Sequence, residues 1–297
     1  MLEQIGISPT QLFGQLLLGF VNGSFYAVLS LGLAVIFGLL NIINFAHGAI
    51  YMLGAFTAWL LLHWFGVGYG AALIIAPLFL AICGILFERT LLRRLYDVDH
   101  LYGLLLTLGM ALVLEGTLRW LFGSSGNPYP VPEELQGVWR LGFMVLPKYR
   151  VWVGGAALTL CLVTWLAIER TRLGAWLRAA TEDPMLVQNF GINVPFLVTA
   201  TFALGVALAG IAGVLAAPIY QVNAMMGSNL IIIVFAVVVI GGMGSIVGSI
   251  VTGVTLGLVE GLTKVFYPPA SDIVIFVIMA IVLLVKPSGL FGKDIHS

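Results

Sequence analysis

Charged residues are scarce in this sequence of 297 residues. They account for 9% of it, whereas about 25% of the residues in a soluble globular protein are charged. Hydrophobic residues account for 61%, and the mean hydropathy is +1.10. The 13 basic and 13 acidic residues give a formal net charge of zero, so there is no electrostatic footprint for nucleic acid. The composition predicts an all-α, polytopic integral membrane protein with no nucleic-acid partner.

The sequence also lacks the residue groups of most enzymes. Its two cysteines, Cys83 and Cys161, lie inside apolar runs, where a thiol usually serves as a small buried side chain. The four histidines show no metal-ligand spacing, and no phosphate-binding loop of the Gly-x-x-x-x-Gly-Lys-Ser/Thr type occurs. The opening "MLEQIGISPTQ" has no basic segment, so we expect no removable signal peptide. We therefore expect neither catalytic residues nor a metal or cofactor in this chain.

Long apolar segments are what the sequence has instead. They lie near residues 12–40, 46–65, 70–87, 101–122, 151–168, 196–218, 224–241, 246–263 and 272–286. At about 20 residues a span they predict about eight or nine transmembrane helices. The count depends on whether the Gly/Asn-interrupted boundaries at 41–45 and 241–244 separate two helices or lie within one. We expect a single transmembrane domain covering residues 1–297.

The distribution of Lys and Arg predicts the orientation. Basic residues gather in the 88–100 loop, in the 169–195 loop and near the C-terminus, and cytoplasmic loops carry such an excess. With nine spans these three regions share one side of the membrane. The prediction is a cytoplasmic C-terminus and an N-terminus outside the cytoplasm.

Polar residues interrupt the apolar run "GLLNIINFAHGAIYMLGAF" at residues 38–56. The break contains Asn41, Asn44, His47 and Gly48. Asn and His side chains offer donors and acceptors to a polar solute, or to backbone groups that a broken helix leaves unpaired. Three interpretations stay open at this point: lining of a transport pathway, structural capping, and a loop at the membrane surface.

Two acid–base pairs occur within apolar segments. Glu115 and Arg119 are four residues apart, which places them on one helix face, where each offsets the other's charge. Ionisable groups within a span are candidates for function, but one Glu beside an Arg is a poor proton carrier, and we favour a structural ion pair. Glu260 and Lys264 have the same spacing, and we expect that pair to reach the membrane interface.

Two loops are long. The loop at 123–149 is rich in Gly and Pro and predicts an extracytoplasmic turn region. The loop at 169–195 is amphipathic, with Leu173, Trp176, Leu177 and Ala180 at helical spacing. Asp183-Pro184 predicts the start of a further helical turn, with Asp as N-cap and Pro at the first position. Such an insert fits a docking partner or a helix resting on the membrane surface.

These motifs resemble those of the permeases of branched-chain amino acid ABC transporters, specifically the Liv-type H subunits. The matching stretches are "NGSFYAVLSLGLAVIFGLLNIINFAHGAIYMLGAF", "LLLTLGMALVLEG", "TRLGAWLRAATEDPMLVQNFGINV", "GGMGSIVGSIVTGVTLGLVE" and "KPSGLFG". They follow in order over essentially the whole chain. The "NFAHG" stretch and the loop at 171–194 are the most specific.

The resemblance implies one half of a permease heterodimer in a bacterial inner membrane. An M-type permease subunit, two cytoplasmic ATPase subunits that hold ATP and Mg, and an extracytoplasmic solute-binding protein would complete the importer. The 171–194 loop is similar to the loop that couples such a permease to its ATPases. Its matching residues are Gly174, Arg178, Ala179, Asp183, Pro184, Gly191 and Ile192. Trp176 and Val187 depart from the smaller residues of many relatives.

The function expected is therefore ATP-driven import of branched-chain or other hydrophobic amino acids. Asn41, Asn44 and His47 are expected to border the translocation pathway or its inner gate. Two alternatives stay open: a permease of the same family for urea or short amides, and a carrier or facilitator that acts alone. A purely structural scaffold fits the polar break poorly, because polar groups in a membrane are costly without a use.

Overall fold

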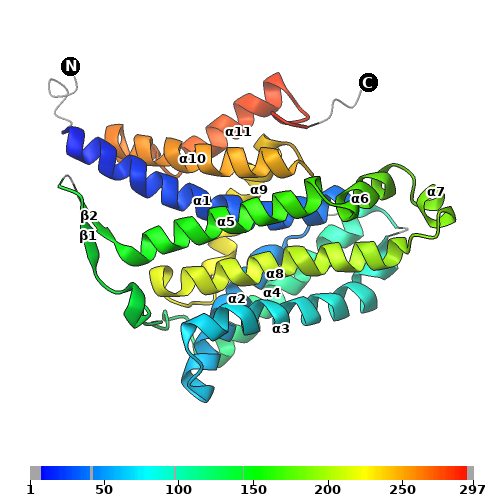
Figure 1. Cartoon of the computed structure of the whole chain (residues 1–297), viewed down its shortest axis with the longest axis horizontal. Coiled ribbons are helices and arrows are strands. Elements are labelled where there is room, and N and C mark those ends of the chain that lie inside the picture. The colour runs from blue at the N-terminus through cyan, green and yellow to red at the C-terminus, as the bar shows by residue number, and fades with distance from the viewer. Residues whose placement is uncertain (1–7, 41–42, 97, 143, 293–297) are drawn as a thin grey trace. The chain divides into compact units, whose positions relative to one another are not determined.

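The computed structural model describes residues 8–40, 43–96, 98–142 and 144–292, which form mainly α-helices (Figure 1). The helices are α1 (Pro9–Leu40), α2 (Ala46–Phe65), α3 (Tyr69–Thr90), α4 (His100–Phe122), α5 (Lys148–Glu169), α6 (Arg172–Glu182), α7 (Pro184–Asn189), α8 (Val194–Tyr220), α9 (Met226–Gly241), α10 (Ile246–Phe266) and α11 (Val274–Val285). Short 3₁₀ helices, η2 (Leu92–Leu95), η3 (Glu133–Leu135) and η4 (Pro268–Ala270), lie between them.

Seven of the described helices are long and apolar enough to cross a membrane: α1, α2, α3 together with η2, α4, α5, α8 and α10. The helices α9 and α11 are apolar but shorter. This architecture agrees with the predicted all-α polytopic class of about eight or nine spans. Both interrupted boundaries, at 41–45 and at 241–244, separate two helices: α1 ends at Leu40 and α2 begins at Ala46, while α9 ends at Gly241 and α10 begins at Ile246.

The long loop at 123–149 holds more structure than the sequence predicts. Besides η3, it contains two short antiparallel strands, β1 (Val138–Arg140) and β2 (Val145–Pro147). Val138 pairs with Pro147 and Arg140 with Val145. Three-residue strands carry too little alternation to be recognised against a Gly- and Pro-rich background.

The chain forms two compact units that alternate along the sequence. The first contains residues up to Ser30, Val131–Cys161 and the residues from Ile233 onward. The second contains Leu31–Pro130 and Leu162–Ile232. The helices α1, α5 and α9 each begin in one unit and end in the other.

In the first unit, α1 and α10 pack with their backbones in contact. Gly23 of α1 meets Gly257 of α10, and a Cβ atom added at Gly261 would lie 2.5 Å from the carbonyl oxygen of Gln15. Glycines allow this approach because nothing projects between the two helices. In lipid, such close van der Waals packing is a main source of helix association.

The Gly-rich turn between α9 and α10 holds the segment that follows α11. The N–H of Leu290 donates to the carbonyl of Ile240 at 2.8 Å, and the N–H of Phe291 donates to that of Gly241 at 3.1 Å. Gly242 and Gly289 have φ values of 99° and 78°, which L side chains rarely adopt. The "GGMGS" and "KPSGLFG" stretches therefore form one backbone-paired element.

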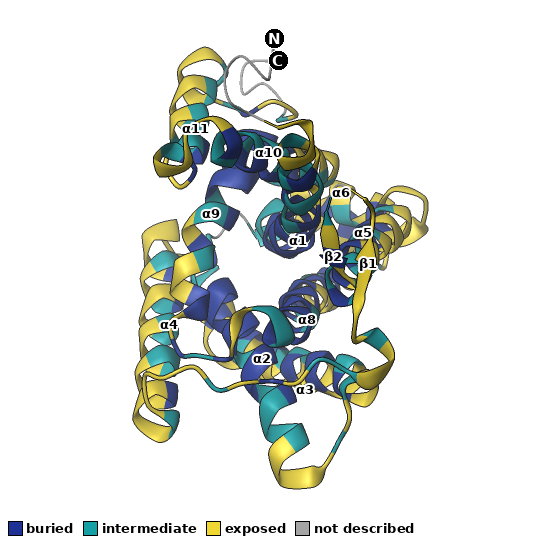
Figure 2. Ribbon diagram, turned by 90° about the vertical axis from the view of Figure 1, so that its left-hand side faces the viewer, coloured by how far each residue is buried: buried dark blue, intermediate teal, exposed yellow. Residues whose placement is uncertain are grey.

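The second unit is built around α8, which packs against α2 and α3. Its backbone touches that of α2 where Gly210 meets Gly54 and Gly213 meets the carbonyl of Tyr51. Phe56 of α2 and Phe202 of α8 are almost completely buried. Figure 2 shows α8 and α2 mainly in the buried colour, whereas much of α4 is exposed.

Candidate functional site

The polar break lies beside a part of α4 that is away from the ends of that helix. α1 ends at Leu40 and α2 begins at Ala46, while Asn41 lies outside the described residues. The hydroxyl of Thr107 accepts a hydrogen bond from the N–H of Phe45 at 3.2 Å and lies 3.2 Å from the carbonyl of Ile43, to which it can donate. Because Thr107 is in the third turn of α4, the break lies roughly 10 Å along the axis of that apolar helix from its start.

Asn44 and His47 are both buried. Asn44 is 1% exposed, and within the described part of the chain neither atom of its amide group has a hydrogen-bond partner. His47 packs against α1, since a Cβ atom added at Gly32 would lie 3.0 Å from the imidazole Cε1. The two side chains therefore lie inside the second unit.

Gly48 marks the place where two helix N-termini meet. It lies in the first turn of α2, and a Cβ atom added there would lie 2.6 Å from the carbonyl oxygen of Gly227, in the first turn of α9. A cavity of about 80 Å³ opens beside this contact. It is lined by Phe45, Gly48, Ala49 and Met52 of the α2 region, Leu108, Ala111, Leu112 and Glu115 of α4, and Gly227, Ser228 and Ile231 of α9. Of the described residues singled out in the break, Gly48 lines this cavity, whereas Asn44 and His47 do not.

Glu115 and Arg119 form an ion pair on α4. The distance from Arg119 Nη2 to Glu115 Oε1 is 2.5 Å, and the side chains are 45% and 20% exposed for Arg119 and Glu115 respectively. Glu115 also lines the cavity, so the structure joins this pair to the break. In the sequence, the Glu115–Arg119 pair and the break were two separate features.

The insert between α5 and α8 begins with a tight corner. Gly174 of α6 lies against the carbonyl oxygen of Ile168 at the end of α5, where any side chain would clash. Arg178 donates to the carboxylate of Glu169, with Nη1 to Oε2 at 3.3 Å. Gly174 and Arg178 thus fix the direction that α6 takes after the end of α5.

The second half of the insert starts as the sequence predicts. Asp183 caps α7, its Oδ1 accepting from the N–H of Leu186 at 2.9 Å, and Pro184 occupies the first turn. The cap prediction is therefore confirmed. Gly191, with φ of 80°, follows the end of α7, and Ala179 is exposed on α6.

The insert has a buried side and an exposed apolar side. Ala180, Val187 and Val194 form a buried cluster, against which Leu39, Ile192 and Val198 pack. We call these six residues the insert cluster. On the other side, Met185 and Phe190 are 79% and 78% exposed, and Leu186 is exposed as well. Leu39 belongs to the last turn of α1, so the insert contacts the helix end that precedes the break.

Comparison with known proteins identifies the family. The model of the family described as the permease component of the branched-chain amino acid transport system matches residues 15–283. The chain belongs to this permease family. The permease is 30% identical to the high-affinity branched-chain amino acid permease LivH of Escherichia coli, over 94% of this chain and 95% of the relative. It is likewise 30% identical to BraD of Pseudomonas aeruginosa, over the same shares of each chain.

A second type of relative also matches the permease. LivM of Escherichia coli is 27% identical over 89% of this chain and 67% of its own length. No solved structure matches the chain. The relatives are transport permeases, and together with the apolar helices they establish a multi-pass membrane protein.

Sequence reasoning missed a buried carboxylate in the permease. Glu88, at the end of α3, is 1% exposed and accepts hydrogen bonds from the hydroxyls of Tyr96 and Thr199, both at 2.7 Å. Burial, and next the Glu88 carboxylate, raise the pKa of Tyr96 well above its ordinary value. Thr199 lies in the second turn of α8, directly after the insert. A charged residue at the end of an apolar run was the signal that could have identified it.

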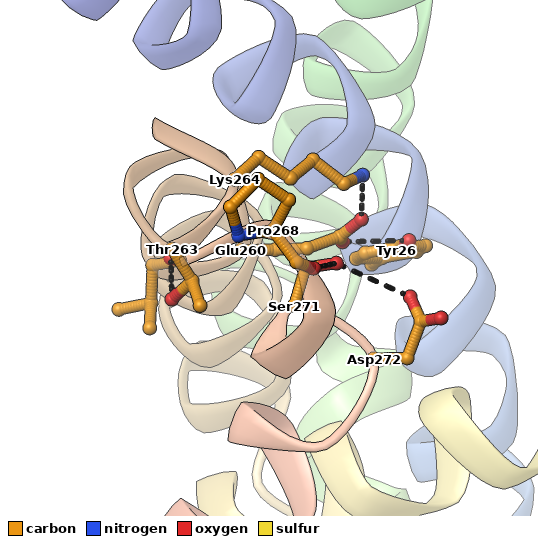
Figure 3. A network of polar contacts seen from close by, with 8 residues as sticks. Tyr26, Glu260, Thr263, Lys264, Pro268, Ser271 and Asp272 are labelled. Carbon is orange, nitrogen blue, oxygen red and sulfur yellow. Dashed lines mark hydrogen bonds and ion pairs between the residues drawn. The ribbon is translucent and has the colours of Figure 1, made fainter. Parts of the chain in front are cut away.

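The Glu260–Lys264 pair has a further partner in the structure. Glu260 is buried at 8% exposure, where its Oε2 accepts from the hydroxyl of Tyr26 of α1 at 2.9 Å and its Oε1 pairs with Lys264 (Figure 3). The carboxylate therefore joins α1 to α10 within the first unit. The sequence showed the spacing along α10 but not the tyrosine, which is 234 positions away.

Proposed function

We propose that the permease is the membrane subunit of an ATP-driven importer for branched-chain or other hydrophobic amino acids. It would pair with an M-type permease subunit and bind two cytoplasmic ATPases, which hold ATP and Mg, and an extracytoplasmic solute-binding protein. The family and the similarity to both LivH and LivM support this assembly. The importer would lie in a bacterial inner membrane, with the C-terminus of this chain in the cytoplasm and its N-terminus outside.

The shape of the insert is the observation that carries the coupling role. Met185, Leu186 and Phe190 expose apolar surface on a segment whose other side is anchored by the insert cluster. Exposed apolar side chains on a helical segment that is packed on its other side suit a protein groove that accepts a short helix. Gly174, Arg178, Asp183, Pro184 and Gly191 build that support, while Ala179 stands exposed beside it.

Coupling requires that the insert contact both the ATPases and the moving parts of the permease. ATP-driven closure of the ATPases would displace the insert, and Ile192 and Leu39 would pass this displacement to the end of α1. A ligand or partner shifts a conformational equilibrium only through different contacts in its two states. The insert cluster links the exposed side chains of Met185, Leu186 and Phe190 to the end of α1, so it would transmit such a difference.

The break itself is proposed as the gate or a wall of the pathway, with Asn41, Asn44, His47 and Gly48. The support is energetic: an unpartnered amide buried in an apolar protein costs roughly 1–3 kcal/mol. Asn44 bears this cost in the conformation described. A second conformation in which its amide meets solute or water would remove that cost. Asn44→Ala should therefore lower the uptake rate or change the substrate range, and unchanged uptake would contradict the assignment.

Reconstitution in lipid vesicles tests the proposed function. The complete importer should take up labelled leucine only with ATP inside and binding protein outside. Uptake by the single chain without these partners would instead establish a stand-alone carrier. Ligand binding to the solute-binding protein, measured with leucine, urea and acetamide, separates the amino acid importer from one for urea or amides.

Two variants test whether the insert binds the ATPases and couples them to uptake. Phe190→Ala should weaken binding of the ATPases to the permease, whereas Trp64→Ala, which removes a 67% exposed aromatic side chain at the end of α2, should not. A disulfide from Ala179→Cys to the ATPase should stop uptake, and reduction should restore it. Full crosslinking with uptake intact would exclude the insert as the coupling element.

A further inference from the structure

The cavity beside Gly48 has an apolar wall on three helices. Phe45 and Met52 contribute from the α2 region, Ala111 and Leu112 from α4, and Ile231 from α9. Its volume of about 80 Å³ is several times the roughly 10–15 Å³ that one water molecule needs. The space therefore suits a short aliphatic group of a few carbon atoms, which would displace poorly bonded water.

The same cavity has charge of both signs at its edge. Gly48 lies in the first turn of α2, whose N-cap residue Phe45 makes no side-chain capping bond, and Gly227 and Ser228 lie in the first turn of α9. Helix N-termini carry a partial positive charge and favour a carboxylate. Glu115 supplies a negative charge on the α4 wall of the same cavity.

The charge of Arg119 offsets that of Glu115, so the site favours a zwitterion over a free cation. Arg119 Nη2 lies 2.5 Å from Oε1 of Glu115, so the pair is neutral before a ligand arrives. A zwitterion adds no net charge to this neutral site, whereas a lone cation or anion would leave one uncompensated in a low dielectric. The ligand ammonium would bind Glu115, and its carboxylate would lie at the two helix N-termini.

We propose that this cavity binds one α-amino acid with a branched aliphatic side chain during translocation, and that Ala111 and Glu115 set its selectivity. The inference rests on the proposed function and goes beyond it, because it assigns substrate contacts to the α2, α4 and α9 walls of this cavity, in addition to the gate residues Asn44 and His47. The aliphatic side chain fills the apolar part, while Glu115 and the helix N-termini hold the α-ammonium and α-carboxylate groups.

Cavity-filling substitution tests the apolar part in the reconstituted importer. Ala111→Leu should lower the ratio of leucine to alanine uptake about tenfold, since one or two methylene groups decide binding in such a pocket. Val113→Leu is the matched control, because Val113 lies on the same helix, is 63% exposed and does not line the cavity. This control should leave the ratio unchanged. An unchanged ratio in Ala111→Leu as well would overturn the proposal.

Labelling tests occupancy without relying on transport. Ser228→Cys, in a variant with Cys83 and Cys161 changed to serine, should react with a small methanethiosulfonate reagent. Leucine should slow this reaction, and adding Glu115→Gln should weaken the protection about tenfold, as expected for loss of a hydrogen bond between charged groups. Protection by leucine amide or isobutane as strong as that by leucine would show an apolar or lipid site instead and would overturn the proposal.

The importer function and the substrate cavity can be tested apart from each other. If the wild-type importer takes up no amino acid, the proposed function fails. If it takes up leucine but neither the Ala111 ratio nor the Ser228 labelling responds, the importer stands and this cavity is not its substrate site.

Discussion

The hydroxyl of Thr107 in α4 accepts a hydrogen bond from the backbone N–H of Phe45, at 3.2 Å, directly before α2 begins. It also lies 3.2 Å from the carbonyl of Ile43, so one side chain spans the described part of the break. Thr107 is completely buried. A helix end buried in an apolar environment needs such a partner, because water is not available to the free backbone groups.

Thr107→Val should destabilise the permease, because it keeps the shape of the side chain and removes the hydroxyl. Loss of the hydroxyl that accepts from the N–H of Phe45 should cost about 1–3 kcal/mol. Thermal unfolding in detergent measures the change, and Thr107→Ser, which keeps the hydroxyl, should retain most of the stability. Equal stability of the valine variant would show that the hydrogen bond to Phe45 contributes nothing.

Gly48→Ala should separate the N-termini of α2 and α9. The added methyl group would lie 2.6 Å from the carbonyl oxygen of Gly227 and 2.9 Å from Cβ of Ile231, so stability should fall by about 1–3 kcal/mol. Gly116→Ala in α4 is the matched control, since no atom lies within 4 Å of the added methyl group. That control should be neutral or gain up to about 1 kcal/mol from helix propensity. If Gly116→Ala lowered the stability more than Gly48→Ala, the close approach at Gly48 would be refuted.

Leu39→Ala should uncouple ATP hydrolysis from uptake. It opens the insert cluster where the cluster meets the end of α1, so ATPase activity should continue while the uptake per ATP falls at least about fivefold. Leu17→Ala, which truncates a partly buried leucine of α1 outside the cluster, is the control. Combining Leu39→Ala with Val187→Ala should add less than the sum of the single effects, because both open the same cluster. Full additivity would argue that Leu39 and Val187 act separately.

Lys264→Met should destabilise the first unit by about 3 kcal/mol, because it leaves the carboxylate of Glu260 buried without its cation. Adding Glu260→Gln should recover much of the loss, since the buried charge is then gone while the amide still accepts from Tyr26. Thermal unfolding of the single and double variants measures both steps. A double variant less stable than Lys264→Met would show that the charge of Glu260 stabilises the fold by itself.

Local chemistry in the sequence was enough for several features. The apolar runs predicted the helices, the residues "NIINFAHG" predicted a break, and Asp183-Pro184 predicted the start of α7. Each of these depends on residues that are neighbours along the chain: helix length, an interrupted run, a capping side chain before a proline. The family followed from the same stretches, because they are specific and lie in order.

The tertiary structure alone decided which helix faces meet. In a soluble protein the polar face of a helix reveals its buried face, but here both faces of most helices are apolar, since lipid is as apolar as a protein core. Several contacts therefore form between two apolar helix faces. They are the hydrogen bonds to Glu88 and Glu260, the α9 wall of the cavity beside Gly48, and the contact of Leu39 with the insert. The sequence by itself determined the membrane class, the break and the cap of α7. Packing between uniformly apolar surfaces, which leaves no polarity pattern along the chain, decided how those parts form a site.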